Sequence, residues 1–340
     1  RLNVDHKVSE RISIGLNVQL SKTIMNRIPS DLAGNAILLR ALEQRPYDVP
    51  YKADGTYSIG GVDILRHNGV QSMNEEKSEN IANKTLASVY TNVKIIDGLS
   101  YKGTLNVDMG NTHDYLYLNQ FHPYGKPAGV VYDFTSNFNS LIIDNMLTFN
   151  KKWNQISLDA IAGHSFQKAS TQVSYIDGRD FPSPSFGYIN AAARINQAYT
   201  NWTGYSLESY LSRATITFKD RYMLSATIRR DGSSRFATGN NYGTFPSASF
   251  GWRVSQEEFL KNVSWIDNLK LRSSFGLTGN QEGIGDFASF PMVTGGNGYN
   301  GQIGLAVTQL GNQDLRWEKA NQTNFGIDMD VFKNRLSFTM

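Results

Sequence analysis

The chain has 340 residues, of which 40% are hydrophobic and 12% aromatic, and its formal net charge is +3. A mean hydropathy of -0.38, without any unbroken apolar stretch near the ~20 residues that a spanning helix needs, excludes a helical membrane protein. The sequence has no cysteine, which excludes disulfides and thiolate sites, and its basic residues are too dispersed to predict nucleic-acid binding.

The first predicted strand covers residues 11–20, where every even position is apolar and every odd position is polar or glycine. Because successive side chains of a strand point to opposite faces, this segment has one apolar and one polar face. The pattern recurs along residues 99–109, 222–228 and 323–331. Together these segments predict a series of about eleven strands.

Short and long connections alternate between the predicted strands. The short ones are Asp97-Gly98, 151–154, 219–221 and 333–334, with a longer one at 255–267 in which Gln256–Leu260 could form a helical turn. The long ones are 21–84, 110–140, 168–204, 230–243 and 279–319. Within the first long loop, Ile37, Leu38, Ala41 and Leu42 share one face and predict a short helix. Short periplasmic turns and long extracellular loops are typical of an outer-membrane barrel.

A soluble β-sandwich or propeller is the alternative all-β fold. Its strands cluster near 5–6 residues, whereas those predicted here run about 10–13, close to the 9–11 of a tilted spanning strand. Soluble domains also rarely contain several structureless loops beyond about 15 residues. We therefore predict an all-β chain, a transmembrane up-and-down antiparallel β-barrel wall, with residues 1–340 forming one region.

Four motifs in the second half of the chain carry a family resemblance. They are DGSSRF at 231–236, FPSASFGWR at 245–253, LKLRSSFGLTGNQ at 269–281 and LGNQDLRWEK at 310–319. In this order they resemble the SusC/RagA family of TonB-dependent outer-membrane transporters. The resemblance implies a barrel of about 22 strands with an N-terminal plug, energised through TonB and capped by a SusD-like lipoprotein. Such pairs take up oligosaccharides or peptides.

We find no plug domain, TonB-contacting segment or closing strand among these residues. The expectation is therefore half of a barrel wall in the bacterial outer membrane, contacting membrane lipid and lipopolysaccharide, that is not a functional unit by itself. Two other functions stay open, a passive porin-type channel and a surface glycan-binding β protein without transport.

Aromatic and amide side chains in the predicted loops are the candidate ligand contacts. They are Tyr188, Tyr199 and Trp202 in one loop, with Tyr205 beside it, and Tyr299, Asn297 and Asn300 in another. Aromatic rings offer apolar faces to sugars or peptide side chains, and amides fix orientation; packing between loops is the alternative role. Trp252, Trp265 and Trp317 are the candidates for a membrane-interface belt, with simple packing as their alternative.

The sequence predicts no enzyme. The five histidines are not at metal-ligand spacing, and His113-Asp114 is interpreted as a polar pair in a loop. Residues 296–301 satisfy GxGxxG without the strand and helix that a dinucleotide site needs. We therefore expect no catalytic residue, no metal and no cofactor.

Overall fold

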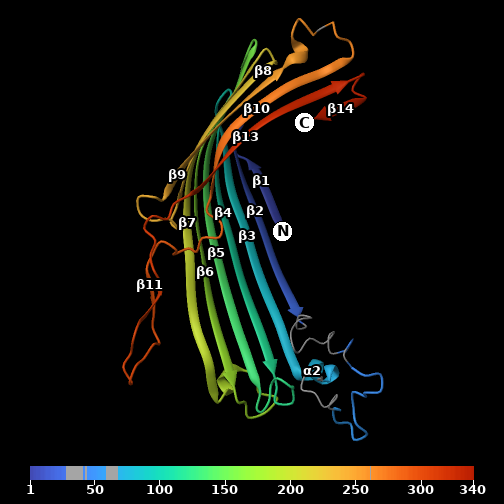
Figure 1. Ribbon diagram of the computed structural model, residues 1–340, viewed down its shortest axis with the longest axis vertical. Coiled ribbons are helices and arrows are strands. Elements are labelled where there is room, and N and C mark those ends of the chain that lie inside the picture. Colours follow the sequence, from blue (N-terminus) through green and yellow to red (C-terminus); the bar gives the residue numbers. More distant parts are fainter. Residues whose placement is uncertain (28–40, 43, 59–67, 261) are drawn as a thin grey trace.

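The computed structural model describes residues 1–27, 41–42, 44–58, 68–260 and 262–340, and one antiparallel β-sheet dominates it (Figure 1). Twelve strands form this sheet in the order β1-β2-β3-β4-β5-β6-β7-β8-β9-β10-β13-β14, and β11 pairs with β12 separately. The strands are β1 (Leu2–Lys7), β2 (Ile12–Asn26), β3 (Glu76–Ile96), β4 (Leu99–Leu118), β5 (Val130–Trp153), β6 (Ile156–Arg179), β7 (Arg194–Phe218), β8 (Tyr222–Ser233), β9 (Tyr242–Arg253), β10 (Ile266–Asn280), β11 (Met292–Thr294), β12 (Ala306–Gln309), β13 (Glu318–Val331) and β14 (Leu336–Thr339). The described helical segments are α2 (Gly69–Glu75) and the 3-10 turns η1 (Ile189–Ala191) and η2 (Val254–Gln256).

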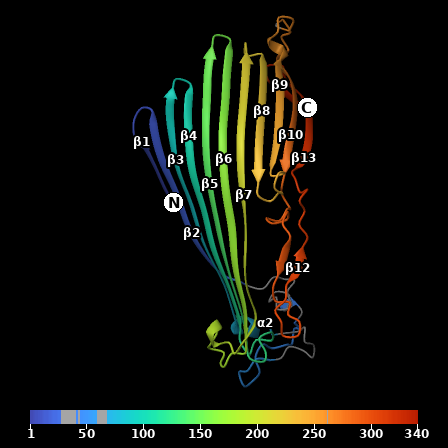
Figure 2. The ribbon, with the colours of Figure 1, turned by 90° about the vertical axis from the view of Figure 1, so that its left-hand side faces the viewer.

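The twelve strands of the main sheet stand side by side in chain order, with only the separate pair β11–β12 left out, so the predicted up-and-down order is confirmed. The sheet is curved across its width. In Figure 1 both edge strands, β1 and β14, lie to the right of β7, and Figure 2 shows the strands side by side from the convex side. The sheet therefore has a convex outer face and a concave inner face.

The strand register assigns side chains to these two faces. One row of the outer face runs through Leu16, Val89, Leu105, Ile143 and Phe166. The adjacent row of the inner face runs through Asn17, Ser88, Asn106, Ile142 and Gln167. Val89 and Leu105 are 49% and 42% exposed. An apolar surface this wide is stable only where it contacts lipid.

The short connections lie at one end of the sheet, as predicted (Figure 2). Gly98, at φ 83°, forms the β3–β4 turn, where a Cβ atom would lie 2.5 Å from the backbone oxygen of Asn150. The longer connection before β10 contains η2, a 3-10 turn that begins two residues before the predicted helical turn at Gln256.

No helix in the described ranges is both long and apolar enough to cross a membrane. The helix predicted around Ile37 and Leu38 lies outside the described residues.

The predicted strand lengths were wrong for the central strands. β3 to β7 contain 21, 20, 24, 24 and 25 residues, so large parts of the predicted loops 21–84, 110–140 and 168–204 are sheet. At ~3.3 Å per residue, 24 residues reach ~80 Å, far beyond the ~25 Å apolar band of a barrel. We call the part beyond this band the extension; it comprises residues 76–83, 111–118, 130–139, 168–179 and 194–206.

The extension was missed because its outer face does not contact lipid and therefore loses the apolar half of the period-2 pattern. The long connections between strands of the main sheet that are described throughout are 119–129, 180–193, 234–241 and 281–317, the last of which contains the short strands β11 and β12. One of them, 180–193, covers the outer face of the extension, where Phe181 packs edge-on against Tyr117 at 5.5 Å beside the fully buried Val131. The hydroxyl of Tyr115 donates to the backbone oxygen of Gly187, and burial of this ring raises the pKa of Tyr115 to about 12.

Candidate ligand-binding site

Three aromatic side chains form a row on the inner face of the extension. The register places Phe134 of β5 opposite Tyr175 of β6, and Tyr175 opposite Tyr199 of β7. The rings of Tyr175 and Tyr199 are 5.2 Å apart between centroids, and Tyr199 is 45% exposed. We call these three residues the aromatic row; it presents ring faces and edges to the hollow of the sheet.

An ion pair with a buried carboxylate and a partly exposed arginine supports one end of this row. Asp177, 3% exposed, accepts hydrogen bonds from Arg179 at 2.8 and 3.0 Å and from the amide of Asn196 at 2.7 Å. The guanidinium of Arg179 holds the pKa of Asp177 below its usual range, although burial acts in the opposite direction. Asp177 therefore remains charged and fixes the strand ends beside Tyr175.

A hollow of about 460 Å³ lies nearer the membrane on the same face, between β7 and the start of β13. Trp317 and Phe245 provide its aromatic wall, with ring centroids 5.5 Å apart, and the pair Arg229–Asp231, joined at 2.7 Å, provides charged groups. The indole nitrogen of Trp317 donates to the backbone oxygen of Asn241 at 2.8 Å, which fixes its ring. Aromatic surface beside a few oriented polar groups is the usual composition of a small-molecule site.

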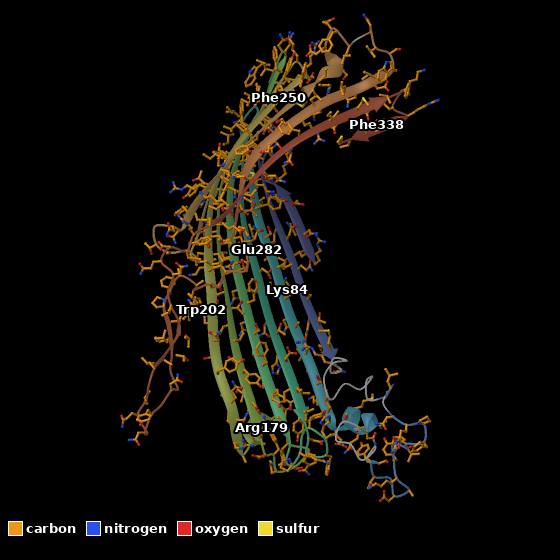
Figure 3. The ribbon with its side chains drawn as sticks, viewed as in Figure 1. Lys84, Arg179, Trp202, Phe250, Glu282 and Phe338 are labelled. Atoms are coloured by element: carbon orange, nitrogen blue, oxygen red, sulfur yellow. The ribbon has the colours of Figure 1, made fainter. Side chains whose placement is uncertain are left out.

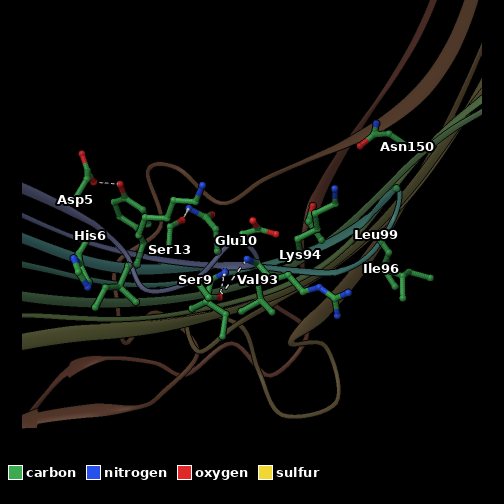
Figure 4. A pocket seen from close by; sticks show the side chains of 18 residues that line it. Asp5, His6, Ser9, Glu10, Ser13, Val93, Lys94, Ile96, Leu99 and Asn150 are labelled. Carbon is green, nitrogen blue, oxygen red and sulfur yellow. Dashed lines mark hydrogen bonds between the residues drawn. The ribbon is translucent and has the colours of Figure 1, made fainter.

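A larger hollow of about 700 Å³ lies beside the β1–β2 turn (Figure 4). Its lining carries charges of both signs, among them Asp5, Glu10 and Lys94. The hydroxyl of Tyr90 donates to Asp5, so part of this polar surface is already satisfied. The hollow lies at the turn end of the sheet, whereas the aromatic row lies beyond the membrane at the other end.

The structure separates the predicted ligand contacts. Tyr199 and Trp202 lie on strand β7 and not in a loop, and they belong to opposite faces because three positions separate them. Tyr199 joins the aromatic row, whereas Trp202 lies on the outer side (Figure 3), where its ring packs at a tilt against Phe287 with centroids 5.8 Å apart. Tyr188 is 76% exposed in the loop 180–193.

Tyr299, Asn297 and Asn300 lie together at the tip of the connection 281–317, where Tyr299 is 87% exposed and exchanges backbone hydrogen bonds with Gln302. No described contact joins this tip to the aromatic row.

The sequence did not predict Phe134 and Tyr175 as ligand contacts, because both positions lie in segments predicted as loops. The alternation Tyr132, Phe134, Ser136, Phe138 was the signal that could have placed them on a strand.

The three belt tryptophans occupy two different environments. Trp252 lies on the outer face near the turns, stacks with Tyr222 at 6.5 Å and donates to Glu257 at 3.0 Å. Trp265 lies at the same end, 6.3 Å from Phe332. An interface role for these two stays a prediction. Trp317 instead lines the inner hollow, so the belt assignment was wrong for this residue.

The His113-Asp114 interpretation was also wrong in its placement, because both residues lie on β4 and point to opposite faces. His113 approaches Asp133 at 3.0 Å on the outer face, and Asp114 pairs with Arg27 at 2.8 Å on the inner one. In the part of the chain that the structure describes, no three or more His, Asp or Glu residues gather as a metal site would require.

Residues 30–340 match the family model of the TonB dependent receptor-like β-barrel. TonB-dependent receptor P39 of Formosa agariphila is 35% identical over 266 residues, which is 74% of this chain and 24% of that protein. TonB-dependent receptor P3 of the same organism is 29% identical over 99% of this chain and 35% of its own length. TonB-dependent receptor SusC of Bacteroides thetaiotaomicron is 36% identical over 154 residues, 44% of this chain and 15% of SusC.

Among solved structures, the RagAB peptide transporter superposes with a TM-score of 0.84 at 24% identity, over 98% of this chain and 38% of that chain. At this identity the likeness shows the fold alone. The chain spans about a third or less of the length of these relatives. The predicted family, fold and location are thereby confirmed: this chain is similar to SusC in sequence and to RagAB in fold, and it belongs to the TonB-dependent receptor β-barrel family of the bacterial outer membrane.

Proposed function

We propose that this chain forms part of the wall of a transporter that imports oligosaccharides or peptides across the outer membrane, energised through TonB. The observation that carries the proposal is the pair of aromatic surfaces on the inner face, the aromatic row outside the membrane and the hollow at Trp317 nearer to it. A ligand that enters from outside meets the first before the second. The name of one relative, SusC, and the description of RagAB as a peptide transporter agree with nutrient uptake.

The physical role of these residues is binding and not covalent chemistry. Ring faces contact the apolar faces of sugars or the side chains of peptides, and the neighbouring amides and ion pairs satisfy polar groups. Such contacts hold a ligand without changing it, so we propose no enzymatic activity. Release into the periplasm requires an energised conformational step, which in this family we assign to a plug and the TonB complex.

We further propose a SusD-like lipoprotein as the partner at the extracellular end. The extension raises the strands β3 to β7 well beyond the apolar band, which offers a large surface at the height where a surface lipoprotein resides. Co-purification of such a lipoprotein with the tagged protein from native membranes tests this point. Recovery of the protein without any lipoprotein under mild detergent would contradict it.

Uptake measurements decide between active import and a passive channel. Cells that lack this gene should lose uptake of the labelled oligosaccharide or peptide that the wild type imports, and cells that lack TonB should lose it equally. Uptake that persists without TonB would favour the porin-type channel. The third function, a surface glycan-binding protein without transport, requires a buried outer face, whereas that face is apolar and exposed; extraction without detergent would support it.

A further inference from the structure

The outer face carries a groove of about 510 Å³ inside its apolar band, across β5 to β8. The groove follows from the side-chain sizes in one register row. Leu147 and Ile228 form its two walls, and the small residues Ala162 and Ser212 lie between them. The row nearer the turns repeats small residues on the middle strands, with Ala160 opposite Ala214. Two rows of small side chains between larger ones therefore form a furrow along the strands that is open toward lipid.

A cation lies at the outer end of this groove. Arg230 is exposed and stacks over the ring of Tyr242 at 4.8 Å. The neighbouring Arg229, on the inner face, is paired with Asp231 at 2.7 Å, whereas no carboxylate in the described ranges pairs with Arg230. The nearby carboxylate of Glu208 is held by three other donors, the hydroxyls of Tyr210 and Tyr242 and the ring of His164.

The height of Arg230 is that of a lipid head group. It lies eight positions beyond Tyr222, which begins β8 at the turn end. At ~2.5 Å of height per residue of a tilted strand this is ~20 Å, near the top of the ~25 Å apolar band. A phosphate attached to acyl chains in the groove would therefore meet the guanidinium.

Polar groups that suit sugars continue above this point on the same face. A register row of amides crosses four strands; its members are Asn83, Asn111, Asn137 and Gln172, and Trp202 ends it. Asn111 donates to Asn137 at 2.7 Å, and Trp202 is 53% exposed. Amides offer both donors and acceptors, and an exposed indole offers an apolar face.

We propose that the outer face between β3 and β8 is a binding site for a phosphorylated glycolipid of the outer leaflet, of the lipopolysaccharide type. An acyl chain occupies the groove over Ala162 and Ser212, a phosphate contacts Arg230, and sugars contact the amide row. The three parts lie in the order in which such a lipid presents them from the membrane interior outward. The site is independent of the import proposed above, because it lies on the opposite face of the sheet.

The first test measures the glycolipid that stays bound to the protein purified from native outer membranes in mild detergent, by native mass spectrometry. Arg230→Gln should lower retention about fivefold, the factor that ~1 kcal/mol per basic side chain at a membrane surface corresponds to. Ser212→Leu should lower it independently by filling the groove. Arg213→Gln is the matched control, because this arginine lies on the inner face and contacts Ser225. Equal retention in all four proteins, or an equal loss in the control, would overturn the proposal.

A second test separates the chemical sources. Delipidated protein is offered nanodiscs that contain lipopolysaccharide, dephosphorylated lipopolysaccharide or phosphatidylethanolamine. We expect preference for the first, and we expect Arg230→Gln to abolish the difference between the first two. Equal binding of phosphatidylethanolamine, or competition by inorganic phosphate alone, would show that the face does not select a glycolipid.

Discussion

The guanidinium of Arg235 and the carboxylate of Asp286 lie 2.9 Å apart although 51 residues separate them in the chain. Their side chains are only 18% and 12% exposed. Asp286 also accepts a hydrogen bond from Thr203, and Arg235 stacks over Tyr205 at 4.2 Å. This pair therefore joins two separate connections, 234–241 and 281–317, to strand β7.

Asp286→Ala should detach the connection 281–317 from β7. Loss of a largely buried partner of an arginine costs about 1–3 kcal/mol locally, because the guanidinium is left without its acceptor. Limited proteolysis of the folded protein should then cut within 281–317 at least several-fold faster. Asp314→Ala, an exposed carboxylate of the same connection, is the control. Unchanged cleavage of the Asp286 variant would show that the pair does not anchor this segment.

The loop 180–193 should loosen in acid through Asp177. The pKa of Asp177 is lowered in the folded protein, chiefly by Arg179, so its contribution is present above the unfolded value of about 3.9. That contribution is lost as the pH falls below about 4 toward the folded pKa. Hydrogen exchange of residues 180–193 should therefore rise in this window for the wild type. Asp177→Asn should show faster exchange already at neutral pH; the same acid response in this variant would assign the transition to another group.

Tyr175→Ala and Tyr199→Ala should each weaken uptake of the imported ligand, mainly as a several-fold higher KM, because each removes one ring of the aromatic row. Burial of a ring against a ligand contributes about 1–2 kcal/mol. Tyr188→Ala, an exposed tyrosine outside the row, should leave uptake unchanged. Surface expression of all three variants must match the wild type. A larger loss of uptake in the Tyr188 variant would show that the ligand contacts lie in the loops and not in the aromatic row.

Single-tryptophan variants should separate the two environments of the belt candidates. In bilayers that contain brominated lipid, Trp252 should be strongly quenched because it lies at the turn end of the outer face, and Trp265 should be quenched too because it lies at the same end of the sheet. Trp317 should be quenched little, since it packs against Phe245 on the inner face. Strong quenching of Trp317 would place its ring against lipid and contradict the geometry of the hollow.

The alternation of apolar and polar residues along the chain was sufficient to predict the strands in the part of the sheet that contacts lipid. Residues 11–20 and 99–109 were predicted as strands because lipid on one side and polar surroundings on the other impose a period of two. The short turns were predictable for a related reason: Gly98 accepts the positive φ that a two-residue hairpin needs. Family membership also followed from the sequence, since the four ordered motifs lie in local stretches of residues 231–319.

The candidate site depended on tertiary structure. Phe134, Tyr175 and Tyr199 are far apart in the chain, and only the register of β5, β6 and β7 aligns them in one row. The extension that carries them lacks the apolar outer face that marked the other strands, so only the period-2 spacing of inner residues such as Tyr132 and Phe134 indicated sheet there. In the same way, Trp317 and Trp252 look alike in sequence, but strand pairing and packing put them on opposite faces. Local chemistry thus determined which segments cross the membrane and the family to which they belong. Long-range pairing decided which side chains meet, because neighbours across a sheet are set by register and not by distance along the chain.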